Sequence, residues 1–164
     1  MRLIALVALL FVTTPSLGED MDLRKALYEK IEALNEVDDN HFPVVSIHDY
    51  FLGNDDEESI APNQWGDGRP SVQEMYEHLK RIEKRPDVQG VFVGIHQDWP
   101  ESERLDEWPP AENIHIYSSA PQDAAEQWIE GLHSDGISPG WPYGKHAAAP
   151  KPLDGYRVYT IYWD

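Results

Sequence analysis

Three histidines and one aspartate have the residue types of a catalytic metal site. His48, His96 and His115 each lie in a strand-like segment and alternate there with apolar residues. If the three strands are neighbours, the imidazoles project in a row from the face of the sheet that no helix covers. Neutral imidazoles suit zinc or copper, and Asp98 could act as general base on a metal-bound water. The pattern predicts a metal-dependent hydrolase; the simpler interpretation is three polar residues on a solvated face, with no cofactor.

Aromatic residues gather in three irregular segments, 52–70, 98–111 and 134–154, which contain many Pro and Gly residues. Long irregular segments in a compact domain commonly carry binding functions. They predict an aromatic and acidic recognition surface, and Trp side chains that stack on sugar rings make saccharide binding an alternative function. The other interpretation is that these aromatics fold back as a second hydrophobic cluster beneath the loops. The residues concerned are Trp65, Trp99, Trp108, Trp141 and Tyr143, together with Asp55 and Asp56.

The charge balance indicates the kind of partner. The chain has 30 Asp and Glu residues against 13 Lys and Arg, so its net charge is -17. Nucleic acid is not an expected ligand, because its binding depends on Lys and Arg side chains that displace counterions. A strongly negative field instead attracts a basic protein or peptide. We therefore expect a binding module of the inhibitor or immunity-protein kind rather than an enzyme.

Several other chemical signatures are missing from the sequence. The chain has no Cys, which excludes disulfides, thiolate metal sites and Cys nucleophiles. Residues 66–71 lack the Gly-Lys-Ser/Thr of a phosphate-binding loop. Residues 54–59 are rich in oxygen ligands but lack the Gly and the distal Glu of an EF-hand, so a solvated acidic loop is expected there, with weak binding of a divalent cation as the alternative. The remaining histidines are expected to be ordinary surface or loop residues: His41, His78, His133 and His146.

Residues 1–18 have the pattern of a secretory signal peptide. Arg2 supplies a positive start, residues 3–12 are all apolar, and Ser16 and Gly18 place small residues before a cut. The apolar run spans about half of a bilayer's hydrocarbon core, so stable membrane insertion is not expected. The alternative is a buried N-terminal helix of a cytosolic protein. We expect a mature α+β domain at 19–164 that is secreted or periplasmic.

Periodicity along the mature chain predicts an α+β fold. An amphipathic helix at 21–37 comes first, and the order after it is βαββαβ. That order is typical of the ferredoxin-like fold, a four-stranded antiparallel sheet in spatial order 4-1-3-2 with both helices on one face. It gathers the three irregular segments at one end, where we expect function to lie. The expected strands are 42–51, 88–96, 113–118 and 156–163, and the expected helices are 71–85 and 119–136.

Capping signals support the two later helices. Ser71 is followed three residues later by Glu74, and Ser119 is followed by Gln122. In a capping box, the Ser side chain and the acidic or amide side chain each bond the other residue's backbone amide. We therefore expect the helices to begin directly after Ser71 and Ser119.

Three stretches of the sequence resemble an uncharacterised family of small bacterial proteins of about this length. They are Val44-Val45-Ser46 through Phe51-Leu52-Gly53-Asn54-Asp55-Asp56-Glu57-Glu58-Ser59-Ile60, then Arg85-Pro86-Asp87-Val88-Gln89, and the terminal Tyr162-Trp163-Asp164. The resemblance covers most of the mature chain. It implies a single-domain protein, and no activity or catalytic residue is established for that family.

Overall fold

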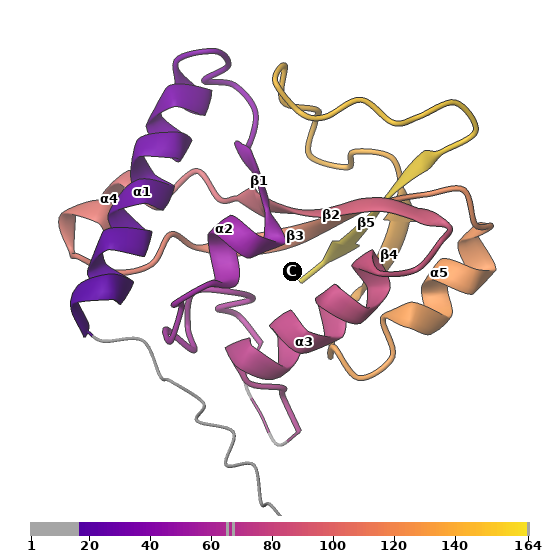
Figure 1. Cartoon of the computed structure of the whole chain (residues 1–164), viewed down its shortest axis with the longest axis horizontal. Coiled ribbons are helices and arrows are strands. Elements are labelled where there is room, and N and C mark those ends of the chain that lie inside the picture. The colour runs from indigo at the N-terminus through magenta and orange to yellow at the C-terminus, as the bar shows by residue number, and fades with distance from the viewer. Residues whose placement is uncertain (1–16, 65, 67, 164) are drawn as a thin grey trace, which may run out of the picture.

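The computed structural model describes residues 17–64, 66 and 68–163, which form an α+β fold (Figure 1). The helices are α1 (Leu17–Asn35), α2 (Ile47–Phe51), α3 (Val72–Glu83), α4 (Trp99–Arg104) and α5 (Gln122–Trp128). The strands are β1 (Val44–Ser46), β2 (Val88–Ile95), β3 (Ala111–Ser118), β4 (Gly136–Pro139) and β5 (Arg157–Tyr162). Among these described residues, no helix combines the length and the apolar character needed to span a bilayer.

The sheet has five strands in the order β1-β2-β3-β5-β4, and every neighbouring pair is antiparallel. The ferredoxin-like order, with four strands arranged 4-1-3-2, is therefore not the one observed. In that fold the first strand lies inside the sheet and runs in the same direction as the second. Here β1 is an edge strand that runs antiparallel to β2, although α2 and α3 separate the two in sequence. The chain between them returns to the same edge instead of crossing over the sheet.

The expected strand at 42–51 is shorter than predicted, because its second half is the helix α2. The side chain of Ser46 caps α2: its Oγ accepts a hydrogen bond from the amide of Asp49 at 3.0 Å and donates one to the Asp49 carboxylate at 2.6 Å. Lys30 of α1 holds the same carboxylate at 2.7 Å. The turn of helix buries Tyr50 and Phe51, which a strand would place on opposite faces. Capping and burial thus outweigh the strand preference of this segment.

The helix expected at 119–136 is also shorter than predicted. The helix α5 follows Pro121 and ends at Trp128, and no side chain caps its start. The hydroxyl of Ser119 instead donates to the carbonyl of Asp87 at 3.5 Å, so the second predicted capping box does not form. Soon after the helix ends, Gly131 adopts a left-handed backbone conformation with φ of 89°, which turns the chain.

The fifth strand, β4, lies in a segment that was expected to be irregular. Its sequence, Gly-Ile-Ser-Pro, contains two residue types that are depleted in strands. It is a strand because residues 136–139 pair with β5 along the outer edge of the sheet. Pro139 ends the strand, which keeps this exposed edge short.

One face of the sheet packs on helices and forms the main core. Val91 and Val93 of β2 and Ile114 of β3 are fully buried on this face. The helix α3 lies alongside it (Figure 1) and presents Met75 and Leu79, each 1% exposed. The capping box predicted for α3 is confirmed. The Ser71 side chain accepts a hydrogen bond from the amide of Glu74, and the Glu74 side chain accepts one from the amide of Ser71.

The opposite face is covered by residues 140–156, which we call the strap. The strap is the long excursion between β4 and β5 in Figure 1. Its Trp141 packs on His115 of β3, with ring centroids 4.1 Å apart. Its far part reaches the turn after α1, where the amide of Ala147 donates to the Asp38 carboxylate at 2.8 Å. The face that was expected to be open is therefore buried beneath a segment without helix or strand.

A histidine of the strap contributes to this attachment. His146 was expected to be an ordinary surface or loop residue; it does lie in a loop, but only 1% of it is exposed. Its Nε2 lies 3.1 Å from the carbonyl of Leu34, in the last turn of α1. The strap therefore contacts the sheet through Trp141, the last turn of α1 through His146, and the turn after α1 through Ala147.

Candidate functional site

The four residues of the expected metal site do not come together. His48 lies on α2 and is exposed, with its Nδ1 3.2 Å from the Tyr76 hydroxyl. His96 follows β2 and lies beside Asp98, with its Nδ1 3.4 Å from the carboxylate. Across the described part of the chain, no group of three or more His, Asp and Glu side chains is placed to hold a metal ion. The prediction fails because His48 belongs to a helix instead of the neighbouring strand.

His115 has a buried environment instead of a solvated one. It points to the face predicted from strand alternation, but only 5% of it is exposed. Its Nδ1 lies 2.8 Å from the hydroxyl of Thr160, and that hydroxyl donates to the carbonyl of Gly140 at 2.7 Å. Burial lowers the pKa of His115 to about 3, so the imidazole is neutral and donates through Nδ1. The ring thus ties the strap to the sheet.

The predicted aromatic surface is mostly internal. Trp99 is 9% exposed and Trp108 is 4% exposed, and both belong to the main core. Trp141 is half-buried on His115, and Trp65 lies outside the described residues. Tyr143 is 48% exposed and stacks on Phe42 with centroids 6.1 Å apart. For Trp99 and Trp108 the structure matches the alternative interpretation, in which the aromatics fold back beneath the loops, and neither ring is available to stack on a saccharide.

The acidic loop that begins at Asp55 is organised by its own side chains. Asp55 is exposed, whereas Asp56 is half-buried and its carboxylate accepts from the amide of Glu58 at 3.0 Å. The buried Asn54 in turn accepts from the amide of Asp56 and donates to Ser59. These bonds hold a turn in place, while Asp55 and Glu58 remain exposed to solvent.

Two of the three irregular segments meet, as expected, at one end of the sheet. The amide of Ala61 donates to the carbonyl of Ala111 at 2.8 Å, and the amide of Ala111 donates to the carbonyl of Ser59 at 2.8 Å. The buried Tyr50 hydroxyl reaches both segments, with its oxygen 2.9 Å from the carbonyls of Ser59 and Pro109. The third segment differs from the prediction, because its strap crosses the far face of the sheet.

Beside this junction, α1 and α4 enclose a groove of about 430 Å³. Five of the lining side chains are carboxylates and two are cations. Arg24 of α1 pairs with Asp106, which follows α4. We call this the α1–α4 groove. It is lined by Met21, Asp22, Arg24, Lys25, Tyr28, Glu29, Glu32, Glu103 and Asp106.

Acidic side chains from separate segments act on the electrostatics of Tyr28, which lines the groove. The Tyr28 hydroxyl donates to the carbonyl of Glu107 at 2.8 Å. Burial raises the pKa of Tyr28, and the charges of Glu103, Glu107 and Asp56 raise it further, while Arg24 acts in the opposite sense. Asp56 belongs to segment 52–70 and the two glutamates to segment 98–111. The fold therefore concentrates negative charge where these segments meet α1.

Exposed apolar side chains lie beside the carboxylates of the α1–α4 groove. Met21 is 60% exposed and lines the groove, and Leu105 is 55% exposed and precedes Asp106. Asp106 adopts a left-handed backbone conformation, with φ of 63°, at the end of α4, where glycine is the usual residue. A surface that combines carboxylates with exposed aliphatic groups can take a cationic side chain together with an apolar neighbour.

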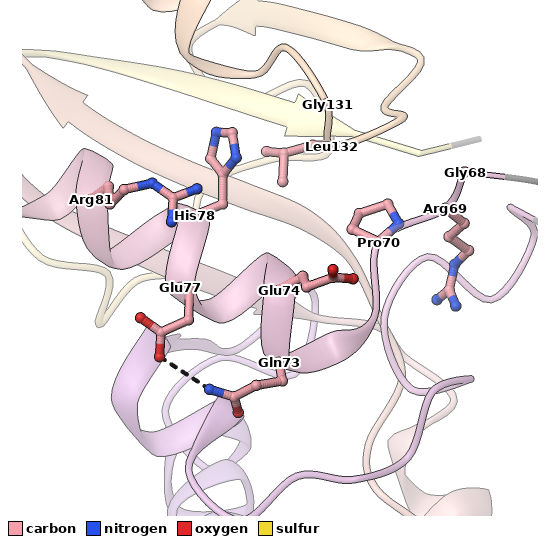
Figure 2. A pocket seen from close by; sticks show the side chains of 10 residues that line it. All are labelled: Gly68, Arg69, Pro70, Gln73, Glu74, Glu77, His78, Arg81, Gly131 and Leu132. Carbon is pink, nitrogen blue, oxygen red and sulfur yellow. Dashed lines mark hydrogen bonds between the residues drawn. The ribbon is translucent and has the colours of Figure 1, made fainter.

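A second groove, of about 510 Å³, runs along α3 (Figure 2). We call it the α3 groove. The imidazole of His78 points across it toward Leu132 and Gly131, and its Nε2 donates to the carbonyl of Trp128 at 2.5 Å. The lining residues are Gly68, Arg69, Pro70, Gln73, Glu74, Glu77, His78, Arg81, Gly131 and Leu132.

Sequence patterns alone did not indicate the α3 groove. Helical spacing places Glu74, His78 and Arg81 on one face of α3, so half of the groove could be recognised from the sequence. The opposite wall, 131–132, lies after α5 and has no sequence signal that assigns it to α3. His78 was expected to be an ordinary surface or loop residue, but it lies on α3 and is half-buried between the two walls.

Family membership follows from a match over most of the chain. A family model described as the uncharacterized protein YfbO family matches residues 22–161. The chain belongs to this family. No curated protein and no solved structure matches it. Membership confirms the resemblance to an uncharacterised family with no established activity.

Proposed function

We propose that the protein is a non-enzymatic acidic module that binds a basic protein or peptide, in the manner of an inhibitor or immunity protein. The observation that carries this proposal is the α1–α4 groove, whose lining has five carboxylates against two cations. Two of these carboxylates, Glu103 and Asp106, come from the irregular segment 98–111. The contact surface would be the α1–α4 groove with the exposed Met21 and Leu105.

Electrostatics favours such a partner at two ranges. At long range, a net charge of -17 accelerates encounters with cationic proteins, an effect that salt screens within about 8 Å at physiological ionic strength. At short range, the groove offers an excess of carboxylates to Lys and Arg side chains. Exposed aliphatic groups at Met21 and Leu105 add apolar contact that salt does not weaken.

We also propose that the protein acts outside the cytoplasm, after removal of residues 1–18. The helix α1 begins at Leu17, so a cut after Gly18 would remove only two residues of it. Gly18 is exposed, and no atom from elsewhere in the described chain lies within 4 Å of the position that a β-carbon would occupy there. This open surrounding supports access of a peptidase.

The binding proposal is tested by affinity capture from an extract at low and high salt. The wild-type protein should retain basic proteins at low salt and release most of them at high salt. The triple variant Glu32→Gln/Glu103→Gln/Asp106→Asn should bind about tenfold more weakly, because each lost charge contributes roughly 0.5 kcal/mol. Asn keeps the left-handed conformation at position 106 accessible.

A matched control removes three carboxylates elsewhere. The variant Asp123→Asn/Glu126→Gln/Glu130→Gln removes the same number of negative charges as the first triple variant. Its three positions lie on α5 or just after it, away from the α1–α4 groove. It should keep most of the affinity. Retention of no basic partner, or a partner indifferent to salt, would refute the proposed function, and equal losses in the two triple variants would place the contact elsewhere.

A further inference from the structure

The α3 groove has a different charge pattern from the α1–α4 groove. Two arginines and two glutamates line it, so its formal charge is balanced. Its volume of about 510 Å³ lies within the usual range of small-molecule sites. A groove of this kind suits a ligand that carries both a positive and a negative charge. The acidic α1–α4 groove suits a cationic ligand instead.

Two charged side chains that line the α3 groove, Arg81 and Glu74, have no ion pair with another described residue. Arg81 is exposed and forms no ion pair within residues 17–64, 66 and 68–163. The other two charged groups that line the groove are already engaged. Glu77 is paired with Lys80 at 2.7 Å, and the Arg69 guanidinium donates to the carbonyls of Glu57 and Ile60.

Glu74 is the second of these groups. Its carboxylate accepts from the amide and the hydroxyl of Ser71, and these bonds lower its pKa, so it stays ionised. It faces no cation within ion-pair distance among the described side chains. The groove therefore presents one uncompensated anion and one uncompensated cation.

The spacing of these two charges sets the length of a matching ligand. Glu74 and Arg81 are seven residues apart on α3, or about 10.5 Å along the helix axis. A peptide of two or three residues spans about 7–11 Å when extended. Because both charged groups stand on long side chains that can lean toward each other, the terminal ammonium and carboxylate of such a peptide would reach both groups together.

The groups between the two charges suit the body of a peptide. Because His78 donates through Nε2 to the carbonyl of Trp128, the neutral form of the ring has Nδ1 as an acceptor for a peptide N–H. Pro70, which is half-buried, offers apolar surface to the groove (Figure 2).

We propose that the α3 groove binds a short zwitterionic peptide of two or three residues, with its carboxylate on Arg81 and its ammonium on Glu74. A backbone N–H bonds to His78, and an aliphatic side chain lies against Pro70. A phosphate dianion fits less well, because the carboxylate of Glu74 would repel it. This site is separate from the surface proposed for a basic partner.

Isothermal titration of the full protein with the tripeptide Ala-Leu-Ala tests the site. The free tripeptide should bind, and blocking either its amine by acetylation or its carboxylate by amidation should weaken binding about two- to fivefold, as expected for loss of one exposed ion pair. Absence of binding by the free tripeptide, or equal binding by the blocked forms, would overturn the proposal.

Variants identify the groups that recognise the two termini. Arg81→Gln should lose the preference for a free carboxylate, and Glu74→Gln should lose the preference for a free amine while its side chain still accepts in the capping box. Lys84→Gln, one position beyond α3 and outside the groove, is the matched control and should bind as the wild type does.

Equal weakening in Lys84→Gln and Arg81→Gln would show a diffuse charge effect and reject the site. Circular dichroism checks that each variant is folded. If one variant does not fold, the blocked tripeptides decide the question with wild-type protein alone.

Discussion

The two faces of the sheet are covered in different ways. One face packs on helices through residues such as Val93 and Met75, which are at most 1% exposed and whose side chains contain no group that must be hydrogen-bonded. The other face is covered by the strap, which is held by Trp141 and by hydrogen bonds from Thr160, Ala147 and other groups. Apolar burial tolerates changes of pH, whereas bonds between ionisable and polar groups depend on protonation and on individual atoms. The strap face should therefore open under conditions that leave the helix face intact.

Acid should give the largest difference between the faces. Burial holds the pKa of His115 near 3 in the folded protein, against an ordinary value of 6.5. Because the unfolded chain takes up this proton at higher pH, the stability from the neutral ring is complete above about pH 6.5. It falls as the pH drops toward 3, by on the order of 4 kcal/mol.

A second strap contact adds to this loss at lower pH. The amide of Ala147 and the ring of His41 hold the pKa of Asp38 at about 2, below its ordinary value of 3.8. The stability from this carboxylate is present above about pH 4 and is lost as the pH falls toward 2. As the pH is lowered, the loss of stability from His115 therefore begins before the loss from Asp38.

Urea unfolding between pH 7 and 2 measures these losses. Between pH 6.5 and 4, the free energy of unfolding of His115→Asn should change less with pH than that of the wild type. The variant His133→Asn, at an exposed position, is the control for the removal of an imidazole. The same slope in His115→Asn and wild type would mean that His115 does not make the strap face sensitive to acid.

Truncation of one residue on each face gives the next largest effect. Trp141→Ala should lower the free energy of unfolding by about 2 kcal/mol, since the ring is only half-buried. Hydrogen exchange should accelerate at the strap amides of Gly140 and Ala147, which donate to Val158 and Asp38, while α3 stays protected. Met75→Ala, at a residue 1% exposed, should cost about 3 kcal/mol and weaken protection in both faces.

A different exchange pattern would remove the distinction between the faces. If Trp141→Ala reduced protection in α3 as much as in the strap, the two faces would unfold as one unit. A strap that opens by itself would instead place the residues beneath it, His115 among them, in contact with solvent.

The elements with local signals could be predicted from the sequence. Helix α3 was expected from the capping box at Ser71 and Glu74, and the structure confirms both its start and its buried stripe. The strands expected at 88–96, 113–118 and 156–163 are confirmed within a few residues. Strand alternation also assigned His115 correctly to the face away from the helices. Each of these predictions depends on neighbours within a few residues.

The strand order could not be predicted in the same way. The pairing of β1 with β2 depends on contacts such as Val45 opposite Val93, which are far apart in sequence. The strap was also missed, because Trp141 covers His115 through a contact that no local spacing encodes. For the candidate sites, the acidic character was evident from composition, but the α1–α4 groove required the position of Arg24 beside Asp106.

The smallest expected effect concerns the helix α2, where local signals compete. Val44 and Val45 favour a strand, and the Ser46 cap stops that strand and starts the helix. Ser46→Ala removes the acceptor for the amide of Asp49 and should lower the free energy of unfolding by about 1 kcal/mol, measured by urea unfolding at pH 7. Ser46→Asn keeps a capping acceptor and should stay within a few tenths of the wild type. If both variants lose the same stability, burial of Tyr50 and Phe51 alone determines the helix, and the cap is not what ends the strand.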